Sequence, residues 1–136
     1  MDEEIFRISR DRDRADDLFE MAKERLELIE IIPKDKTYKI IEEFYEVIKE
    51  LLTAVMYLDG YKTLSHVKLL EYFSSNYDEL DEKEIKLIDR LRRLRNGILY
   101  YGRRIGKEFL INNEEDVRRI IEILIELVGR KLKSDQ

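Results

Sequence analysis

Apolar residues recur every three or four positions along most of the chain, which is the spacing of one face of an α-helix. The spacing is most regular in residues 38–58, where the apolar positions are Ile41, Phe44, Ile48, Leu51, Val55 and Leu58. Tyr45 and Leu52 widen this face, so we expect this helix to lie at the centre of the fold. No stretch alternates between polar and apolar residues for long enough to predict a sheet.

One further helix is predicted before this central helix in the sequence, and one after it. The first covers about residues 11–32 and ends before Pro33, since proline lacks the amide hydrogen that a helix needs. Its inward residues are Ala15, Phe19, Ala22, Leu26 and Ile29. The third covers about residues 64–77. Its inward residues are Val67, Leu70, Phe73 or Ser74, and Tyr77.

Two helices are predicted in the second half of the chain. Asp81 and Glu84 have the spacing of a capping box and start the fourth helix. Its apolar positions are Leu87, Leu91, Leu94, Ile98, Tyr101 and Ile105. The segment "GKEFLINNEED" then interrupts the pattern, and Asn113 is expected to cap a fifth helix. The inward residues of that helix are Val117, Ile120, Ile121, Leu124 and Val128.

The connections between these helices are short, which favours antiparallel neighbours. "PKDK" joins the first two helices, and "DGYKT" follows the second, with Gly60 suited to a positive φ at the helix end. Residues 1–136 show neither an internal repeat nor a linker. We therefore expect one all-α domain, an antiparallel up-and-down bundle of four long helices and one short helix.

Composition narrows the class of protein. Hydrophobic residues make up 43% of the chain and charged residues 42%, and the absence of Cys excludes disulfides and thiolate metal sites. The start, "MDEEIFRISRDRDR", is charged, so no signal peptide is expected, and no window approaches a membrane span of about 18 apolar residues. We expect a cytoplasmic protein without a membrane contact. The many charges of both signs are typical of proteins from thermophiles.

Positive charge is concentrated in one segment, "RLRRLRNGILYYGRRIGK", residues 90–107. It carries seven positive charges and no negative one in a chain of net charge −5, so the remainder has a net charge of −12. Six of the seven are arginines, whose planar guanidinium suits phosphate oxygens, and tyrosine can stack on a base. The segment predicts phosphate or nucleic-acid contact. The alternative is a solvated helix whose arginines pair with neighbouring acids.

On a helical wheel, one flank of the fourth helix collects part of this segment: Arg92, Arg95, Asn96, Leu99 and Arg103. Arg90, Arg93 and Arg104 point elsewhere. The candidates for phosphate or nucleic-acid contact, taken over the whole segment, are Arg92, Arg95, Arg103, Arg104 and Tyr101.

The segments "LRRLRNGILYYG" and "LLTAVMYLDGYKTLSH" resemble the HEPN superfamily, the higher eukaryote and prokaryote nucleotide-binding domains, with similar helix order over about residues 12–130. HEPN domains are small helical bundles, often dimeric and often encoded beside a minimal nucleotidyltransferase in a toxin–antitoxin or substrate-binding pair. The resemblance implies a homodimer through the fourth helix, a nucleotidyltransferase as protein partner, and RNA or a nucleotide as ligand. It implies no cofactor.

Several HEPN members are metal-independent RNases whose motif is Arg, a polar residue, three further positions and His. Arg95 matches the motif arginine and Asn96 the polar residue, while Tyr100 stands where the histidine is expected. In that family the histidine helps to move a proton as the ribose 2′-hydroxyl attacks the phosphate. With an ordinary pKa near 10, tyrosine is a poor general base at neutral pH. The resemblance therefore implies a site that is degenerate for catalysis.

His66 is the only histidine and lies near the start of the third helix. It is interpreted as a structural hydrogen-bonding residue or, alternatively, as a replacement for the motif histidine. No metal site is expected, since a second His and any Cys are lacking. The candidate catalytic residues are Arg95, Asn96, Tyr100 and His66.

Three functions stay open. The first is a HEPN-like domain that binds RNA or a nucleotide, and the second is a metal-independent endoribonuclease that uses Arg95 with Tyr100 or His66. The third is a bundle that binds only another protein. Whether the chain is an enzyme is not decided by its sequence.

Overall fold

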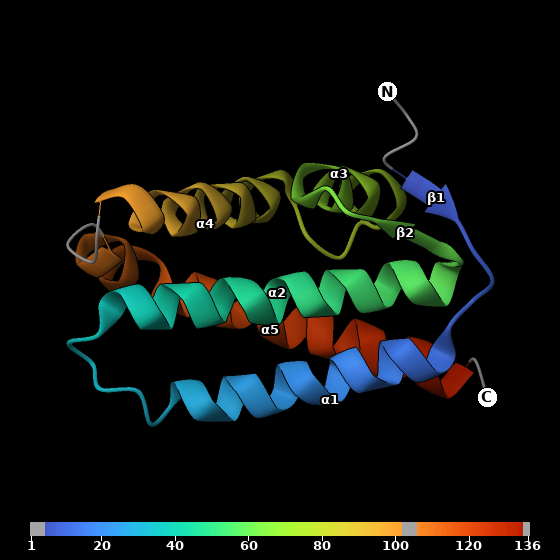
Figure 1. Ribbon diagram of the computed structural model, residues 1–136, viewed down its shortest axis with the longest axis horizontal. Coiled ribbons are helices and arrows are strands. Elements are labelled where there is room, and N and C mark those ends of the chain that lie inside the picture. Colours follow the sequence, from blue (N-terminus) through green and yellow to red (C-terminus); the bar gives the residue numbers. More distant parts are fainter. Residues whose placement is uncertain (1–4, 102–105, 135–136) are drawn as a thin grey trace.

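The computed structural model describes residues 5–101 and 106–134, and of residues 99–101 only the backbone. Four long helices run alternately in opposite directions: α1 (Arg12–Ile29), α2 (Thr37–Asp59), α4 (Glu82–Tyr101) and α5 (Lys107–Ser134) (Figure 1). The short α3 (His66–Asn76) lies between α2 and α4 in the sequence. The prediction of an all-α, up-and-down bundle is confirmed.

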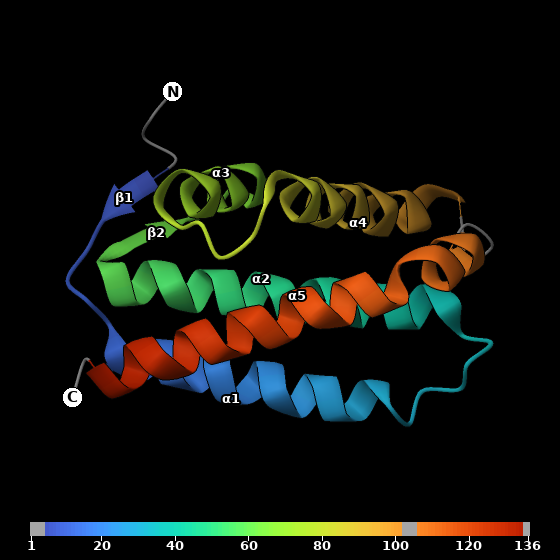
Figure 2. The ribbon, with the colours of Figure 1, turned by 180° about the vertical axis from the view of Figure 1, so that it is seen from behind.

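Helix α2 is the central element of the bundle and packs against all four other helices. In Figure 1, α3 and α4 follow one another along one side of α2 while α1 lies along the other side, and Figure 2 shows α5 crossing α2 at a shallow angle. Every residue predicted for the inner face of α2 is buried: Ile41, Phe44, Tyr45, Ile48, Leu51, Leu52, Val55 and Leu58. Each large apolar side chain buried in this way stabilises the fold by about 1.5–3 kcal/mol.

Two predicted helix ends are confirmed in detail. Gly60 follows α2 with φ 89°, a left-handed conformation that glycine adopts without a steric penalty, and its amide donates to the carbonyls of Met56 and Tyr57. At the start of α4, the Asp81 amide donates to Glu84 at 2.9 Å and the Glu84 amide to Asp81 at 2.8 Å. This reciprocal pair is the predicted capping box.

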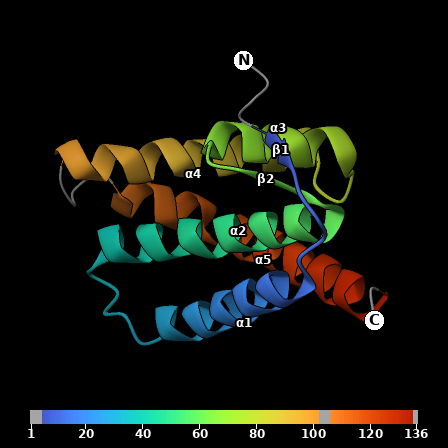
Figure 3. The same cartoon turned by 45° about the vertical axis from the view of Figure 1, so that its right-hand side comes forward.

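Beside the helices, the structure contains a small sheet that the sequence pattern did not indicate. Strand β1 (Ile5–Arg7) pairs antiparallel with β2 (Tyr61–Thr63), and Ile5 lies opposite Thr63. The pairing continues as Ile8 N–H donates to the Gly60 carbonyl, and Figure 3 shows β1 beside α3 and the following segment running down to the start of α1. Strands of three residues are too short to produce a readable alternation, so the sequence pattern could not predict them.

The predicted start of the fifth helix is wrong. Helix α5 begins at Lys107, and Asn113 lies within it, where its side-chain amide donates to the Phe109 carbonyl at 3.0 Å. Leu110 and Val117 are both buried and lie seven residues apart on one face of α5. The polar residues between them interrupt the apolar spacing in the sequence, but the helix continues through them. The five predicted inward residues from Val117 to Val128 are all buried.

Smaller differences concern α1 and α3. Helix α1 ends at Ile29, three residues earlier than predicted, and residues 30–36 form the connection to α2. In α3, Val67 is 45% exposed, whereas Leu69 shares the buried face with Leu70 and Phe73. Leu70 and Phe73 are buried as predicted, so the buried face of α3 is turned only slightly from the predicted one, toward Leu69 and away from Val67.

Candidate nucleic-acid interface

Arg95 lies on the flank of α4 that faces α2, in a position fixed by three neighbours. Its Nη2 donates to Oε1 of Glu46 at 2.9 Å, and its Nη1 donates to Oδ1 of Asn96 at 3.2 Å. The guanidinium carbon is 5.3 Å from the centroid of the Tyr45 ring, within the range of a cation–π contact. Arg95 and Asn96, which the sequence singled out, are thus in direct contact.

Asp89 holds the neighbouring arginines of α4. Its Oδ1 accepts from Nε of Arg92 at 3.0 Å and lies 2.9 Å from Nη2, while its Oδ2 is 3.2 Å from Nε of Arg93. The Arg92 side chain is mostly buried, whereas that of Arg93 is 65% exposed. One carboxylate therefore partly balances two guanidinium groups.

His66 lies on the same corner of the molecule as Arg95, because both contact Tyr45. The rings of His66 and Tyr45 are 5.7 Å apart and tilted by 44°. His66 is the first residue of α3, where Ser65 caps the helix through the Lys68 amide. We call Tyr45, Glu46, His66, Arg92, Arg95 and Asn96 the Arg95 corner.

Burial and charge set the protonation states in this corner. Burial, and then the charges of Lys49 and Arg95, hold the pKa of His66 below its ordinary value of 6.5, so the imidazole is neutral at pH 7. Burial raises the pKa of Tyr45 to about 12, against the nearby arginines. Burial alone would raise the pKa of Glu46, but the hydrogen bond from Lys49 and the positive charges around it lower the pKa overall.

The remaining predicted site residues are not placed. Tyr100 and Tyr101 end α4, but their side chains lie outside the described residues, as do Arg103 and Arg104. The structure therefore brings together four of the predicted residues: Arg92, Arg95, Asn96 and His66.

Two residues of the corner were not assigned to the site from the sequence. Tyr45 was predicted as part of the core, and Glu46 was one of many acidic residues. In the sequence, Tyr45 and Glu46 stand only at the edge of the apolar face of α2, near Lys49. That position does not predict which other helix they contact.

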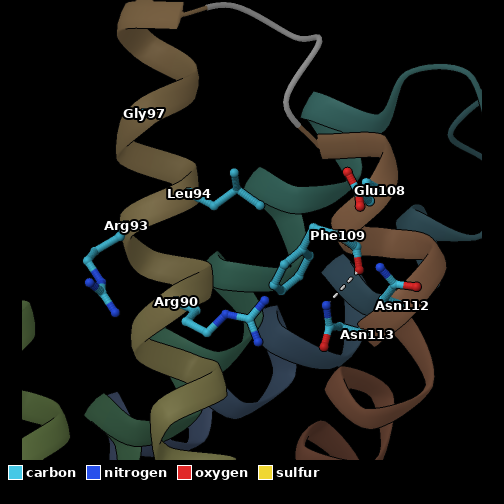
Figure 4. A pocket seen from close by; sticks show the side chains of 8 residues that line it. All are labelled: Arg90, Arg93, Leu94, Gly97, Glu108, Phe109, Asn112 and Asn113. Carbon is cyan, nitrogen blue, oxygen red and sulfur yellow. Dashed lines mark hydrogen bonds between the residues drawn. The ribbon is translucent and has the colours of Figure 1, made fainter.

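A second feature of α4 lies on its other side, where a groove runs between α4 and α5 (Figure 4). This α4–α5 groove has a volume of about 720 Å³ and is lined by Arg90, Arg93, Leu94, Gly97, Glu108, Phe109, Asn112 and Asn113. The Arg90 guanidinium reaches toward α5 and lies 5.5 Å from the Phe109 ring centroid, while Arg93 extends away from α5. The arginines of α4 are thus divided between two sides of the helix.

Within residues 5–101 and 106–134, no three His, Asp or Glu side chains converge in a way that would hold a metal ion. In the same part of the chain, no helix combines the length and apolar character needed to cross a membrane.

The fold and the site define a helical bundle with a fixed arginine–amide pair on one corner. Searches against models of protein families, curated proteins and solved structures give no significant match to this chain. The resemblance to HEPN domains therefore stays a prediction, based on the sequence segments quoted for it.

Proposed function

We propose that this chain is a HEPN-like domain that binds RNA or a nucleotide, with the Arg95 corner as its phosphate contact. The observation that carries the proposal is the geometry of Arg95, which Glu46 and Tyr45 hold beside Asn96 before any ligand arrives. A guanidinium fixed in this way loses little side-chain entropy on binding a phosphate. Of its five N–H donors, Arg95 uses two in bonds to described residues.

Three of the four arginines of α4 that the structure describes pair with acids, as the alternative of a solvated helix expects, but these pairs leave the charge of the region unbalanced. Four cationic side chains share two carboxylates: Lys49 and Arg95 pair with Glu46, while Arg92 and Arg93 pair with Asp89. The described groups therefore leave an excess of positive charge in a chain that is acidic overall. An incoming phosphate group would reduce that excess.

The proposed assembly is a homodimer through α4, with a minimal nucleotidyltransferase as protein partner, as the resemblance to HEPN domains implies. Mass measurement by light scattering tests the dimer. A monomer at all accessible concentrations would remove the dimer from the proposal but leave the phosphate contact.

Binding of a fluorescent single-stranded RNA, measured by anisotropy at several salt concentrations, tests the phosphate contact. We expect Arg95→Ala to weaken binding roughly tenfold and to lower the salt dependence by about one phosphate contact. Arg130→Ala is the control, because Arg130 is a 60% exposed arginine of α5 with only long ion pairs of 4.0 Å. Equal affinity of the two variants would remove Arg95 from the proposed role. Thermal unfolding of both variants shows whether weaker binding comes from the missing contact or from a less stable fold.

A second candidate function, a metal-independent endoribonuclease, is favoured by the position of His66. The neutral imidazole shares the Tyr45 ring with Arg95, so a base and a phosphate-binding group lie on one corner. In this reaction His66 takes the proton of the ribose 2′-hydroxyl, whose oxygen attacks the adjacent phosphorus. The bond to the 5′ oxygen breaks, which leaves a 2′,3′-cyclic phosphate and a 5′-hydroxyl end once that oxygen is protonated.

Incubation of the protein with RNA in the presence of EDTA tests this candidate. Cleavage that is lost in both His66→Gln and Arg95→Ala but kept in Tyr100→Phe would assign the base to His66. Cleavage that persists in all three variants would come from a contaminating enzyme and would exclude the candidate.

A further inference from the structure

Arg90 differs from the other arginines of α4 that the structure describes. Arg92 and Arg93 pair with Asp89, and Arg95 pairs with Glu46. No carboxylate of the described residues lies within ion-pair distance of Arg90, and its guanidinium instead lies over the Phe109 ring. A guanidinium on an aromatic face keeps its N–H groups available for an anion, because the ring occupies only its flat side.

The α4–α5 groove around Arg90 has the surfaces that a planar ligand needs. Leu94 and Phe109 are half-buried and form an apolar floor, and Gly97 leaves the wall of α4 without a side chain (Figure 4). The volume of about 720 Å³ lies within the range of small-molecule sites.

Polar groups of α5 complete the lining. The Asn112 side chain is exposed and forms no hydrogen bond to a described residue, so its carboxamide offers a donor and an acceptor together. Asn113 donates to the Phe109 carbonyl, and Oδ1 stays available as an acceptor. Glu108 adds a negative charge to the lining, which disfavours a phosphate on its side of the groove.

From these features we propose that the α4–α5 groove binds one nucleotide, with the phosphate on Arg90 and the base against Phe109 and Leu94. A carboxamide such as that of Asn112 can form paired hydrogen bonds with the edge of adenine, and an aromatic ring can stack on any base. An acidic peptide could pair with Arg90 and with the amides, but an Asp or Glu side chain offers no flat face to Phe109 and Leu94. A nucleotide is therefore the ligand class that matches the cation, the apolar floor and the amides together.

This inference deepens the proposed function and rests on it for the role of RNA. Because α4 carries arginines on both sides, a single RNA strand that crosses this helix would meet the Arg95 corner with a phosphate. The same strand would place an unstacked nucleotide in the α4–α5 groove. Binding of a free mononucleotide, in contrast, depends on the groove alone.

Titration of the ¹⁵N-labelled protein with 5′-AMP, adenosine and inorganic phosphate tests the groove. We expect 5′-AMP to shift the amide signals of residues 90–98 and 107–113, and to bind more tightly than adenosine or phosphate. Arg90→Gln should weaken 5′-AMP binding roughly tenfold, since a hydrogen bond to a charged group is lost. Asn112→Ala should weaken 5′-AMP binding severalfold and leave phosphate binding unchanged.

Arg119→Gln is the matched control, because Arg119 is an exposed arginine of α5 that pairs with Glu84 and Asp116 away from the groove. An equal loss of 5′-AMP binding in Arg119→Gln and Arg90→Gln would overturn the inference, as would absence of 5′-AMP binding at millimolar concentration. Phosphate or an acidic peptide that binds as tightly as 5′-AMP would overturn the nucleotide as ligand.

The outcome for RNA separates this inference from the proposed function. If Arg95→Ala does not affect RNA binding but 5′-AMP still binds in an Arg90-dependent way, the Arg95 corner fails and the groove stands. If RNA binding depends on Arg95 but 5′-AMP does not bind, the groove fails and the proposed function stands.

Discussion

Tyr45 has two roles at the scale of single residues. It is 3% exposed and belongs to the core face of α2, and its ring also contacts the Arg95 guanidinium and the His66 imidazole. The ring thus fixes both groups relative to the hydrophobic core. The geometry of the corner depends on the same packing that stabilises the bundle.

The protonation of His66 can be tested directly, because the chain has a single histidine and its imidazole signals need no assignment. We expect its pKa to lie below 6.5, because burial and the charges of Lys49, Arg95 and Arg92 disfavour the imidazolium more than Glu46 favours it. An NMR titration measures this pKa. A midpoint at or above 6.5 would contradict the partly buried, cation-facing position of the ring.

The lowered pKa of His66 also makes the free energy of unfolding depend on pH. Because the folded protein binds the proton less tightly than the unfolded chain, the contribution of His66 is fully present above pH 6.5 and is lost as the pH falls through its folded pKa. His66→Gln should make the free energy of unfolding less dependent on pH in this range. An unchanged slope would mean that His66 is solvated as in the unfolded chain.

Two glycines of the last part of the chain are expected to respond oppositely to alanine. A Cβ at Gly106 would collide with Cδ1 of the fully buried Ile41, so Gly106→Ala should destabilise the fold by about 1–3 kcal/mol. A Cβ at Gly129 would lie 3.6 Å from the Phe19 ring, an ordinary contact inside a helix. Gly129→Ala should therefore stabilise the fold by up to about 1 kcal/mol.

Urea unfolding of the two variants, compared at their midpoints, measures both effects. A Gly106→Ala variant as stable as the wild type would show that Ile41 has room to move within the core.

At the scale of elements, α1 and α2 are joined by an ion-pair network as well as by apolar contacts. Arg25 of α1 donates to Glu50 through Nε and Nη2, both at 3.1 Å, and to Glu43 through Nη1 at 2.8 Å. Glu50 is the single buried charged residue of the described part of the chain, with 5% exposure. The hydrogen bonds of Arg25 satisfy a carboxylate that has little contact with water.

Removal of Arg25 should therefore be costly. Arg25→Ala leaves Glu50 buried without its partner and should destabilise the fold by about 3–5 kcal/mol, since an unpaired buried charge is strongly unfavourable. The double variant Arg25→Met, Glu50→Leu should recover most of this loss. Chemical denaturation measures both. A loss below about 1 kcal/mol in Arg25→Ala would indicate that water reaches Glu50.

The sequence predicted elements well where periodicity is long and poorly where it is short. The face of α2 is confirmed residue by residue, because its apolar spacing continues over the whole helix. The start of α5 was missed because its second and third turns carry "NNEED" after the buried Leu110, and β1 and β2 are each three residues long. The start of α5 is set by packing against α2, and β1 and β2 by their pairing with each other, and neither leaves a local pattern in the sequence.

From the sequence, the positions of site residues could be predicted only relative to other residues of the same helix, α4. That Arg95 and Asn96 share a flank follows from the helical wheel, and in the structure the two side chains are hydrogen-bonded. That Glu46 and Tyr45 hold Arg95, and that Arg90 lies over Phe109, depends on how α4 packs against α2 and α5. No spacing within α4 contains that information.

At the scale of the whole molecule, Asp59 connects three parts of the fold. Its Oδ2 accepts from the Tyr72 hydroxyl at 2.7 Å and from the Tyr77 hydroxyl at 2.6 Å, and its Oδ1 lies 2.8 Å from Nζ of Lys131. These partners belong to α3, to the residue after it and to α5. Burial alone would raise the pKa of Asp59, but the hydrogen bonds from Lys131 and the two tyrosines lower it overall.

Asp59→Asn should lower the free energy of unfolding at pH 7 by about 2–3 kcal/mol, because hydrogen bonds to a charged group are among the strongest in proteins. Since the folded pKa lies below the ordinary value of 3.8, this contribution is present above about pH 3.8 and is lost as the pH falls further. The difference between wild type and variant should therefore shrink in acid. Unfolding curves at pH 7 and pH 3 measure it, and a difference that is equal at both pH values would contradict the charge-based role.

The pairing of β1 with β2 has a consequence for how the bundle opens. Residues 30–36 join α1 to α2 at one end, and at the other end the β1–β2 ladder is extended by the bonds of Ile8 to Gly60 and of Asp11 to Tyr57. Helices α1 and α2 are thus connected at both ends, by a loop at one end and by backbone hydrogen bonds at the other. We therefore expect loss of the β1–β2 pairing to make it easier for α1 to separate from α2.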